Sequence, residues 1–181
     1  MKMSEKEIIE KAKKGNNKAF SELYKTHVTR LYRFMKQCGS RYSNDEIEDI
    51  VQRAFVKAFT KIDTFEHTSS FSTWLFRIAM NELRSDMRRV SLVTLEAIAD
   101  EIYDYEDEHA DEFVWNMAMK EMLNELSDIK KSVFILYEVE GYSHAEIGHI
   151  LGMEESSSRS LLARTKQFLR KRWILSKEID L

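Results

Sequence analysis

The stretch SHAEIGHILGMEESSSRSLLARTK, residues 143–166, predicts two helices separated by a turn at Gly152. Ser143 and Glu146 have the spacing of a capping box, so the first helix begins at about residue 143. Glycine readily adopts the backbone conformation that ends a helix, and a second helix follows over about 155–174. This outline is that of a helix-turn-helix, whose second helix commonly enters the DNA major groove.

The second of these helices separates its side chains by chemistry. On a helical wheel, one stripe is formed by Leu161, Leu162, Thr165, Phe168 and Leu169. The opposite side carries Arg159, Ser160, Ala163, Arg164, Lys166, Gln167, Arg170 and Lys171. After Glu155 the helix has six basic residues and no acidic one. An amphipathic helix with a basic solvent face is the alternative, but the capped first helix and the glycine turn favour DNA contact.

Outward from this motif, the rest of the chain also reads as helical. The 181 residues include no proline and five glycines, the two residue types that most often interrupt helices. Helices are predicted from a capping box at Ser4 and Glu7 to Gly15, and over 18–37, 44–62, 71–89, 113–125 and 128–139. No segment has the alternating pattern of a strand, so the predicted fold class is all-α.

Apolar residues at helical spacing predict which helix faces are buried. In the helix over 18–37 they are Phe20, Leu23, Tyr24, Leu31 and Phe34. In the helix over 44–62 they are Ile47, Ile50, Val51, Ala54, Ala58 and Ile62. Each set lies on one face at 3.6 residues per turn, as in helices that pack on a core.

An acidic segment divides the chain. From residue 100 to residue 112, eight of thirteen residues are Asp or Glu, with no Lys or Arg. Dense like charge opposes compaction, so this segment reads as a linker. We predict a helical domain over 1–90, an acidic linker over 91–111 and a second helical domain over 112–181.

The predicted helix over 71–89 has two contrasting faces. Its apolar arc holds Leu75, Phe76, Ala79, Met80, Leu83 and Met87, and the opposite arc holds Trp74, Arg77, Asn81, Arg84 and Arg88. Arginines suit phosphates, an amide can pair with base edges, and an indole can stack on an unpaired base. The alternative is a solvated face whose Trp74 packs into a neighbouring helix.

Composition narrows the classes of function. The net charge of −3 means that any nucleic-acid surface depends on uneven charge distribution. No apolar run has the length of a membrane span, and the first residues lack a signal-peptide core, so a cytoplasmic location without membrane insertion is expected. A lone cysteine, Cys38, fits a reducing compartment. Because no catalytic constellation, metal-ligand spacing or phosphate-binding glycine loop occurs, we expect neither an enzyme nor a cofactor or metal.

Four segments resemble bacterial RNA polymerase sigma factors of the extracytoplasmic-function group. They are AFSELYKTHVTRLYRFM, DEIEDIVQRAFVKAF, FSTWLFRIAMNELRSDMRR and VFILYEVEGYSHAEIGHILGMEESSSRSLLARTK. The resemblance covers both predicted domains. It implies a transcription initiation factor that binds core RNA polymerase and directs it to promoter DNA. It also implies an anti-sigma partner.

The resemblance implies a role for each set of residues. The first domain would bind the polymerase clamp through Glu46, Glu48, Asp49 and Gln52, and Glu46, Asp49 and Gln52 lie off the apolar stripe of their helix. It would melt the minus-ten element, with Asn81 capturing an unstacked base. Arg84, Arg88 and Arg89 would lie near the DNA backbone, and Arg84 and Arg88 share the helix face of Trp74 and Arg77.

The second domain would read the minus-thirty-five element, and the acidic linker would follow the polymerase channel near the RNA path. Arg159, Ser160, Ala163 and Arg164 match the family's recognition positions, and Lys166 lies on the same side of the predicted helix.

Several positions depart from the family pattern. Arg53 stands where the family usually has an acidic residue, and Tyr137 stands where an arginine often touches promoter phosphate. Ser127 replaces a common proline and retains the ability to cap a helix. At Glu154–Ser158 the usual start of the recognition helix is replaced by carboxylates and small hydroxyls, which we expect to face the phosphate backbone.

Two other functions fit parts of the sequence. A sigma-like adaptor would bind polymerase or a regulator without reading promoters, and a conventional DNA-binding regulator would use the helix-turn-helix alone. The acidic face of one helix together with the Asn81 face of the next favours the initiation factor over both.

Overall fold

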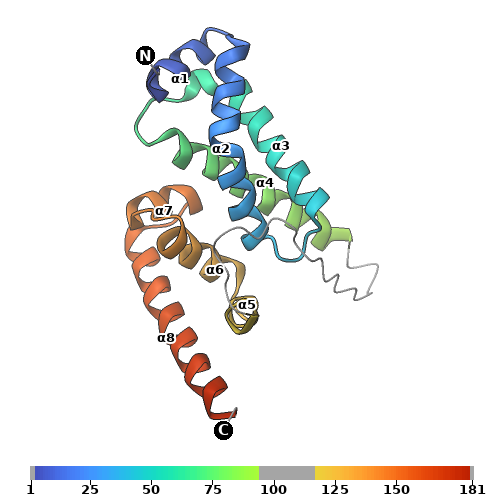
Figure 1. Cartoon of the computed structure of the whole chain (residues 1–181), viewed down its shortest axis with the longest axis vertical. Helices are drawn as coiled ribbons and strands as arrows, with labels where there is room; N and C mark the ends of the chain where they lie inside the picture. The colour runs from blue at the N-terminus through green and yellow to red at the C-terminus, as the bar shows by residue number, and fades with distance from the viewer. Residues whose placement is uncertain (1–2, 94–116, 180–181) are drawn as a thin grey trace. The chain divides into compact units, whose positions relative to one another are not determined.

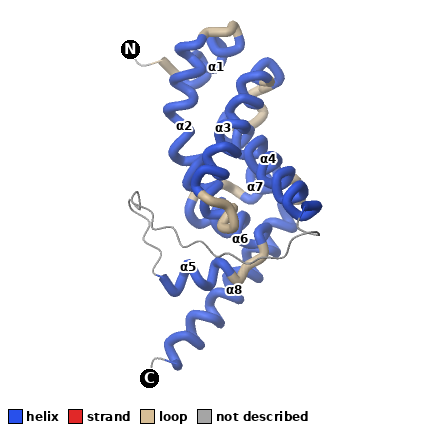
Figure 2. The backbone as a smooth tube through the Cα atoms, turned by 90° about the vertical axis from the view of Figure 1, so that its right-hand side faces the viewer, coloured by secondary structure: helices blue, strands red, loops and turns tan. Residues whose placement is uncertain are grey.

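The computed structural model describes residues 3–93 and 117–179, with side chains over 3–87 and 119–175 (Figure 1). The chain forms two compact units, Met1–Glu101 and Ile102–Leu181, called here the N-terminal unit and the C-terminal unit. Over the described ranges Figure 2 shows helices and loops, which confirms the predicted all-α class. The predicted acidic linker over 91–111 falls largely outside the described residues.

Over its described residues, 3–93, the N-terminal unit forms four α-helices and one 3₁₀ turn. They are α1 (Glu5–Lys13), α2 (Asn17–Cys38), α3 (Asn44–Thr60), the turn η1 (Ile62–Thr64) and α4 (Phe71–Val93). The capping box predicted at Ser4 and Glu7 is present, and a second one at Ser43 and Glu46 starts α3. In each box the serine oxygen accepts the N–H of the glutamate, and the glutamate carboxylate accepts the serine N–H.

The core of this unit lies where α2, α3 and α4 meet. Phe34 of α2 and Phe76 of α4 stack with ring centroids 5.0 Å apart, and both are buried. All six apolar residues predicted for the helix over 44–62 are buried, five of them on α3 and the sixth, Ile62, in η1. Full burial of one such aliphatic side chain stabilises the fold by about 1.5–3 kcal/mol, so this face holds α3 firmly against its neighbours.

The prediction for α2 holds at three of its five positions. Leu23, Leu31 and Phe34 are buried as expected, Phe20 is half-buried, and Tyr24 is 38% exposed. The Tyr24 ring lies at the edge of the bundle, with its centroid 4.7 Å from that of Phe55. A tyrosine at this boundary covers apolar surface with its ring while its hydroxyl can remain in water.

The C-terminal unit is built around the long helix α8 (Glu155–Ile179). Preceding it are α5 (Met117–Asn124), α6 (Asp128–Phe134), the π-helical turn η2 (Ile135–Val139) and α7 (His144–Leu151). The sequence predicted one regular helix over 128–139. The structure instead widens it into a π turn, in which the N–H of Glu140 donates to the carbonyl of Ile135 at 3.0 Å.

The first helix of the helix-turn-helix begins and ends at the predicted residues. Ser143 and Glu146 form the capping box of α7, and Gly152 ends this helix with φ 67°. Gly148 adds a constraint that the sequence analysis did not identify. A Cβ atom at this position would lie 2.6 Å from the carbonyl oxygen of Met153, so α7 and the turn approach each other closely only because residue 148 is glycine.

Candidate nucleic-acid and partner interfaces

The residues predicted to bind polymerase lie on the exposed surface of α3, in its N-terminal half. Glu46, Glu48, Asp49 and Gln52 are all exposed. Glu46 is also used locally, because its Oε2 accepts hydrogen bonds from the N–H and the hydroxyl of Ser43 at 2.8 and 2.9 Å. No comparable hydrogen bond within α3 is described for the side chains of Glu48 and Gln52. The four residues therefore share an acidic surface but differ in how freely each can meet a partner.

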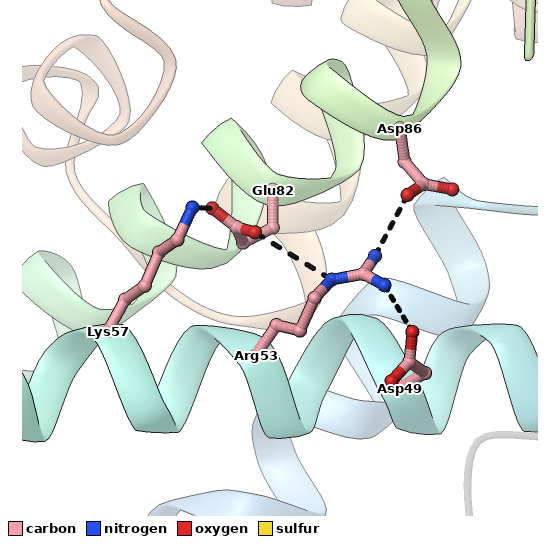
Figure 3. A network of polar contacts seen from close by, with 5 residues as sticks. All are labelled: Asp49, Arg53, Lys57, Glu82 and Asp86. Carbon is pink, nitrogen blue, oxygen red and sulfur yellow. Dashed lines mark hydrogen bonds and ion pairs between the residues drawn. The ribbon is translucent and has the colours of Figure 1, made fainter. Parts of the chain in front are cut away.

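Arg53 joins this acidic surface to α4 (Figure 3). Its guanidinium pairs with Asp49 on its own helix, lies 2.9 Å from Asp86 Oδ1 and reaches Glu82 Oε2 at 3.8 Å. Lys57, one turn further along α3, donates to Glu82 Oε1 at 2.5 Å. Glu82 is only 7% exposed, and burying a carboxylate is costly unless cations pair with it, as Arg53 and Lys57 do here.

The sequence analysis did not identify this network. Glu82 and Asp86 are four residues apart, and on the wheel of α4 both fall beside Leu75 on the side that packs against the bundle. Two carboxylates on a packing face require cations on the facing helix. That signal was present in the sequence, but Arg53 was considered there only for its departure from a family pattern.

Trp74 belongs to an aromatic cluster in this structure. Its ring is half-buried, with its centroid 5.3 Å from that of Phe65 and 5.8 Å from that of Phe71. These contacts agree with the alternative in which Trp74 packs against its neighbours. Arg77 and Asn81 are exposed on α4, as the wheel predicted.

Three more arginines were predicted to lie near DNA farther along α4. Arg84 is half-buried. The side chains of Arg88 and Arg89 lie outside the described residues. The apolar arc of the same helix is buried as predicted at Leu75, Phe76, Ala79, Met80 and Leu83, while Met87 is half-exposed.

The loop before α4 is held by α1. Lys13 Nζ donates to the carbonyl of Phe65 at 2.9 Å, and His67 Nε2 lies 2.9 Å from Glu10 Oε1. The hydrogen bond from His67, followed by that from Lys13, holds the pKa of the Glu10 carboxyl below its ordinary value. His67 has φ 57°, a left-handed conformation that is uncommon outside glycine, so these contacts stabilise a turn that the chain would not adopt freely.

In the C-terminal unit, the predicted reading face of α8 is exposed. The five residues concerned, all exposed, are Arg159, Ser160, Ala163, Arg164 and Lys166. Leu162, Thr165 and Leu169 are buried on the opposite side, as predicted for the apolar stripe. Leu161 and Phe168 are half-buried at the edges of the stripe.

Two cations of this face already pair with carboxylates of the same unit. Arg159 pairs with Glu155 one turn earlier in α8, and Lys166 Nζ lies 2.5 Å from Glu138 Oε1. The ammonium of Lys166 also lies 5.7 Å from the centre of the Tyr137 ring. A phosphate that approached these cations would have to compete with the carboxylates, whose ion pairs are exposed and therefore weak.

The prediction for the start of α8 was wrong for Ser158. Glu154, Glu155, Ser156 and Ser157 are exposed, but Ser158 is completely buried, and its hydroxyl lies 2.9 Å from His144 Nδ1. The reason is helical register. Ser158 precedes Leu162 by one turn and therefore lies on the packing stripe rather than on the face that we expected to meet phosphate.

His144 connects Ser158 to the π turn. Its ring stacks on that of Tyr137, with centroids 4.5 Å apart and an interplanar angle of 21°. Desolvation, followed by the charge of Arg159, lowers the pKa of His144 below its ordinary value. A neutral imidazole at this position allows close packing among α7, α8 and the π turn.

The described ranges contain no candidate metal site and no candidate membrane span. Among residues 3–93 and 117–179, no group of three or more His, Cys, Asp or Glu side chains could hold a metal ion. No helix within these ranges is long and apolar enough to cross a membrane.

Comparison with known proteins gives two family matches and full-length relatives. Residues 23–92 match Sigma-70 region 2, and residues 116–169 match Sigma-70, region 4. The ECF RNA polymerase sigma factor SigW of Bacillus subtilis is 29% identical over 187 aligned residues, which cover 94% of this chain and 97% of the relative. The ECF RNA polymerase sigma-E factor of Escherichia coli is 26% identical, and the alignment covers 91% of this chain and 92% of that relative.

A solved structure shares the fold. The sigma factor RpoE from Bartonella quintana, in complex with the anti-sigma factor NepR, matches with a TM-score of 0.73 and 25% identity. The match covers 86% of this chain and 97% of that one.

Proposed function

The chain belongs to the extracytoplasmic-function group of RNA polymerase sigma factors, and from this premise we propose how its helices divide the work of initiation. As a member, it is a transcription initiation factor that directs RNA polymerase to promoters. The observation that carries this conclusion is that region 2 and region 4 follow one another in a single chain. We propose no catalytic step for the chain itself, because the bond-forming chemistry is that of the polymerase.

In this proposal the acidic surface of α3 binds core polymerase. Glu48, Asp49 and Gln52 are exposed side by side on this helix, where a basic surface of a partner could approach. Complementary charge of this kind raises the rate of encounter and selects the orientation of binding. Glu46 would contribute its charge while it continues to cap the helix.

The exposed face of α4 would melt the minus-ten element. The Asn81 amide can donate to and accept from a base edge, and Arg77 can pair with the phosphate backbone. Trp74 lies one turn before Arg77 and Ile78, at the margin of the aromatic cluster. It would support the melted strand from that cluster, while Arg84, Arg88 and Arg89 extend the positive charge along the helix.

The exposed face of α8 would read the minus-thirty-five element. Arg164 is the strongest candidate for a base contact, because its guanidinium is exposed and its Nε–H donates to the carbonyl of Ser160 at 3.2 Å, which orients the side chain along the helix. Arg159 and Lys166 would contact phosphates after leaving their carboxylate partners, and Ser160 and Ala163 would allow the helix to approach closely.

The remaining parts would serve assembly and control. We propose domain limits of 1–90 and 112–181, with the acidic segment over 91–111 following the polymerase channel as a mimic of nucleic acid. The structural relative from Bartonella quintana is bound by an anti-sigma factor, and we propose that this chain is restrained by a protein of the same kind. The site of action would be the cytoplasm, where the polymerase works.

Run-off transcription tests the proposal. Core polymerase with this protein and a library of randomised promoter templates is expected to give discrete transcripts that core polymerase alone does not give. If the protein forms a stable complex with core polymerase but yields no promoter-dependent transcript on any template, it is a sigma-like adaptor and the proposal is wrong. DNA binding by the protein without any complex with polymerase would instead identify a conventional regulator.

A further inference from the structure

The ion-pair network between α3 and α4 connects two surfaces that the proposed function uses separately. Its members are Asp49, Arg53 and Lys57 on α3, and Glu82 and Asp86 on α4 (Figure 3). The three residues of α3 are spaced one turn apart, and so are the two of α4. Two cations of α3, Arg53 and Lys57, therefore face the two carboxylates of α4, and Asp49 pairs with Arg53 from the same helix.

Arg53 is the centre of the network because its contacts lie in three directions. It reaches one carboxylate on its own helix and two on the facing helix. A planar guanidinium presents several N–H donors in fixed directions, so one arginine can hold several carboxylates in a defined geometry. Lys57, with a single charged nitrogen, contacts only one of them among the described pairs.

The carboxylates on either side of Arg53 differ in exposure. The Asp49 side chain is 61% exposed, whereas those of Asp86 and Glu82 are 22% and 9% exposed. The exposed member can be reached by a partner protein without rearrangement of the bundle. The inner members are less accessible to a partner, so we expect their pairing with Arg53 to persist when Asp49 is engaged elsewhere.

The inner carboxylates also follow closely after the residue that is proposed to capture a base. Glu82 follows Asn81 directly in α4, and Asp86 lies just over one turn beyond it. Pinning Glu82 against α3 fixes the rotation of α4 at this point. The direction in which the Asn81 amide faces then depends on contacts made by α3.

From this geometry we propose that Arg53 is a positioning residue that couples polymerase binding by α3 to promoter melting by α4. In the free protein Arg53 shares its charge among three carboxylates and partly neutralises Asp49. When a basic group of the polymerase takes over Asp49, Arg53 is left to Glu82 and Asp86 and holds α4 more firmly. The inference rests on the proposed function, since it assigns no role to Arg53 in a protein that meets no polymerase.

The test compares affinity for core polymerase with the yield of open complex, in full-length protein, on a template where the wild-type holoenzyme forms open complexes. Arg53→Ala frees Asp49, so affinity for core polymerase is expected to rise by about twofold to fivefold, as for the loss of a competing exposed ion pair. The yield of open complex at saturating core polymerase, measured by permanganate reactivity, is expected to fall by about fivefold.

Further variants separate positioning from folding. Asp86→Asn removes a partner on α4 alone and is expected to lower the open-complex yield. Affinity for core polymerase should not rise as it does in Arg53→Ala, because Arg53 still pairs with Asp49. Arg53→Lys retains the positive charge but lacks the planar set of N–H donors, and it is expected to restore part of the open-complex yield. Arg33→Ala is the matched control, because Arg33 is an exposed arginine of α2 outside the network, and it is expected to change neither quantity.

The outcomes are distinguishable. If Arg53→Ala and Asp86→Asn both lower affinity and yield in proportion to a loss of thermal stability, Arg53 is merely structural and the inference is wrong. An unchanged yield with Arg53→Ala also overturns it. If the wild-type protein itself forms no open complex on any template, the proposed function fails and this inference fails with it.

Discussion

The two units use similar ion pairs at opposite depths. In the N-terminal unit, Arg53 and Lys57 reach inward to a buried carboxylate, Glu82. In the C-terminal unit, Glu138 lies over Lys166 on an exposed helix, where both side chains remain in contact with water. Coulomb attraction is strong in the first setting and screened in the second. The inner pairs therefore fix the structure of α3 and α4, whereas the outer pairs can exchange for a phosphate.

The largest expected effect is a loss of stability when both cations that pair with Glu82 are removed. Arg53→Ala with Lys57→Ala leaves an uncompensated carboxylate at a buried site, so we expect a loss of about 3 kcal/mol in the free energy of unfolding. Urea denaturation, followed through the unfolding transition of the N-terminal unit, measures this loss. Adding Glu82→Gln to the pair removes the buried charge and should recover most of the loss. A double variant as stable as wild type would show that the inner pairs are no stronger than surface pairs.

Next in size is the removal of the proposed base contact on α8. Arg164→Ala is expected to weaken promoter binding by about 1–3 kcal/mol if the guanidinium reads a base edge. Competition binding of holoenzyme to templates with altered minus-thirty-five elements measures this. The loss should vanish on the template altered at the contacted base pair. An unchanged affinity would mean that another part of the α8 surface faces DNA.

On α4, Asn81→Ala is expected to lower the open-complex yield by about tenfold while leaving affinity for core polymerase within about twofold of wild type. The amide would contact a base only after the strands separate, so its loss affects melting rather than assembly. Permanganate reactivity and fluorescence anisotropy measure the two quantities on the same preparation. Equal yields for variant and wild type would exclude base capture by Asn81.

Opening the outer pairs should improve DNA binding slightly. Glu138→Gln and Glu155→Gln release Lys166 and Arg159, and together they are expected to raise promoter affinity by about threefold at low salt. The gain should shrink as salt rises, because the pairs are exposed. Glu121→Gln, an exposed glutamate of α5 outside these pairs, serves as the control. A loss of affinity in the double variant would show that the carboxylates position the cations rather than compete for them.

The smallest effect concerns the pH dependence of the C-terminal unit. Because the pKa of His144 is lowered on folding, mainly by desolvation, the unfolded chain takes up a proton more readily. The stability that the neutral ring contributes is full above the unfolded pKa, near 6.5, and is lost as pH falls through the lower folded value. Titration of the ring by NMR should give a midpoint below 6.5. A midpoint above it would contradict the packing described for Tyr137, His144 and Ser158.

Local patterns predicted most of the helices and their buried faces. The apolar stripe of α3, the capping boxes at Ser4 and Ser143, and the turn at Gly152 all follow from interactions within a few residues of the chain. The face of α8 that remains exposed follows from the same periodicity. These features are readable because a helix places residues three and four apart on one side whatever it packs against.

Contacts between helices were harder to predict. Arg53 and Asp86 are 33 residues apart, and their pairing depends on the rotation and register of α3 against α4. The hydrogen bond between Ser158 and His144 and the packing of Trp74 against Phe65 likewise depend on neighbours that the local pattern does not specify. For Ser158 and Glu82 a warning was present, since a polar residue on an apolar stripe requires a buried partner.

The close approach at Gly148 gives the C-terminal unit a practical use in protein engineering. Because α7 meets the turn through backbone contact, the placement of α8 does not depend on the residues of its exposed face. Those residues can be treated as an exchangeable cassette. A library randomised at Arg159, Ser160, Ala163 and Arg164, with Gly148, Ser158 and Thr165 retained, would keep the scaffold while new promoter sequences are selected.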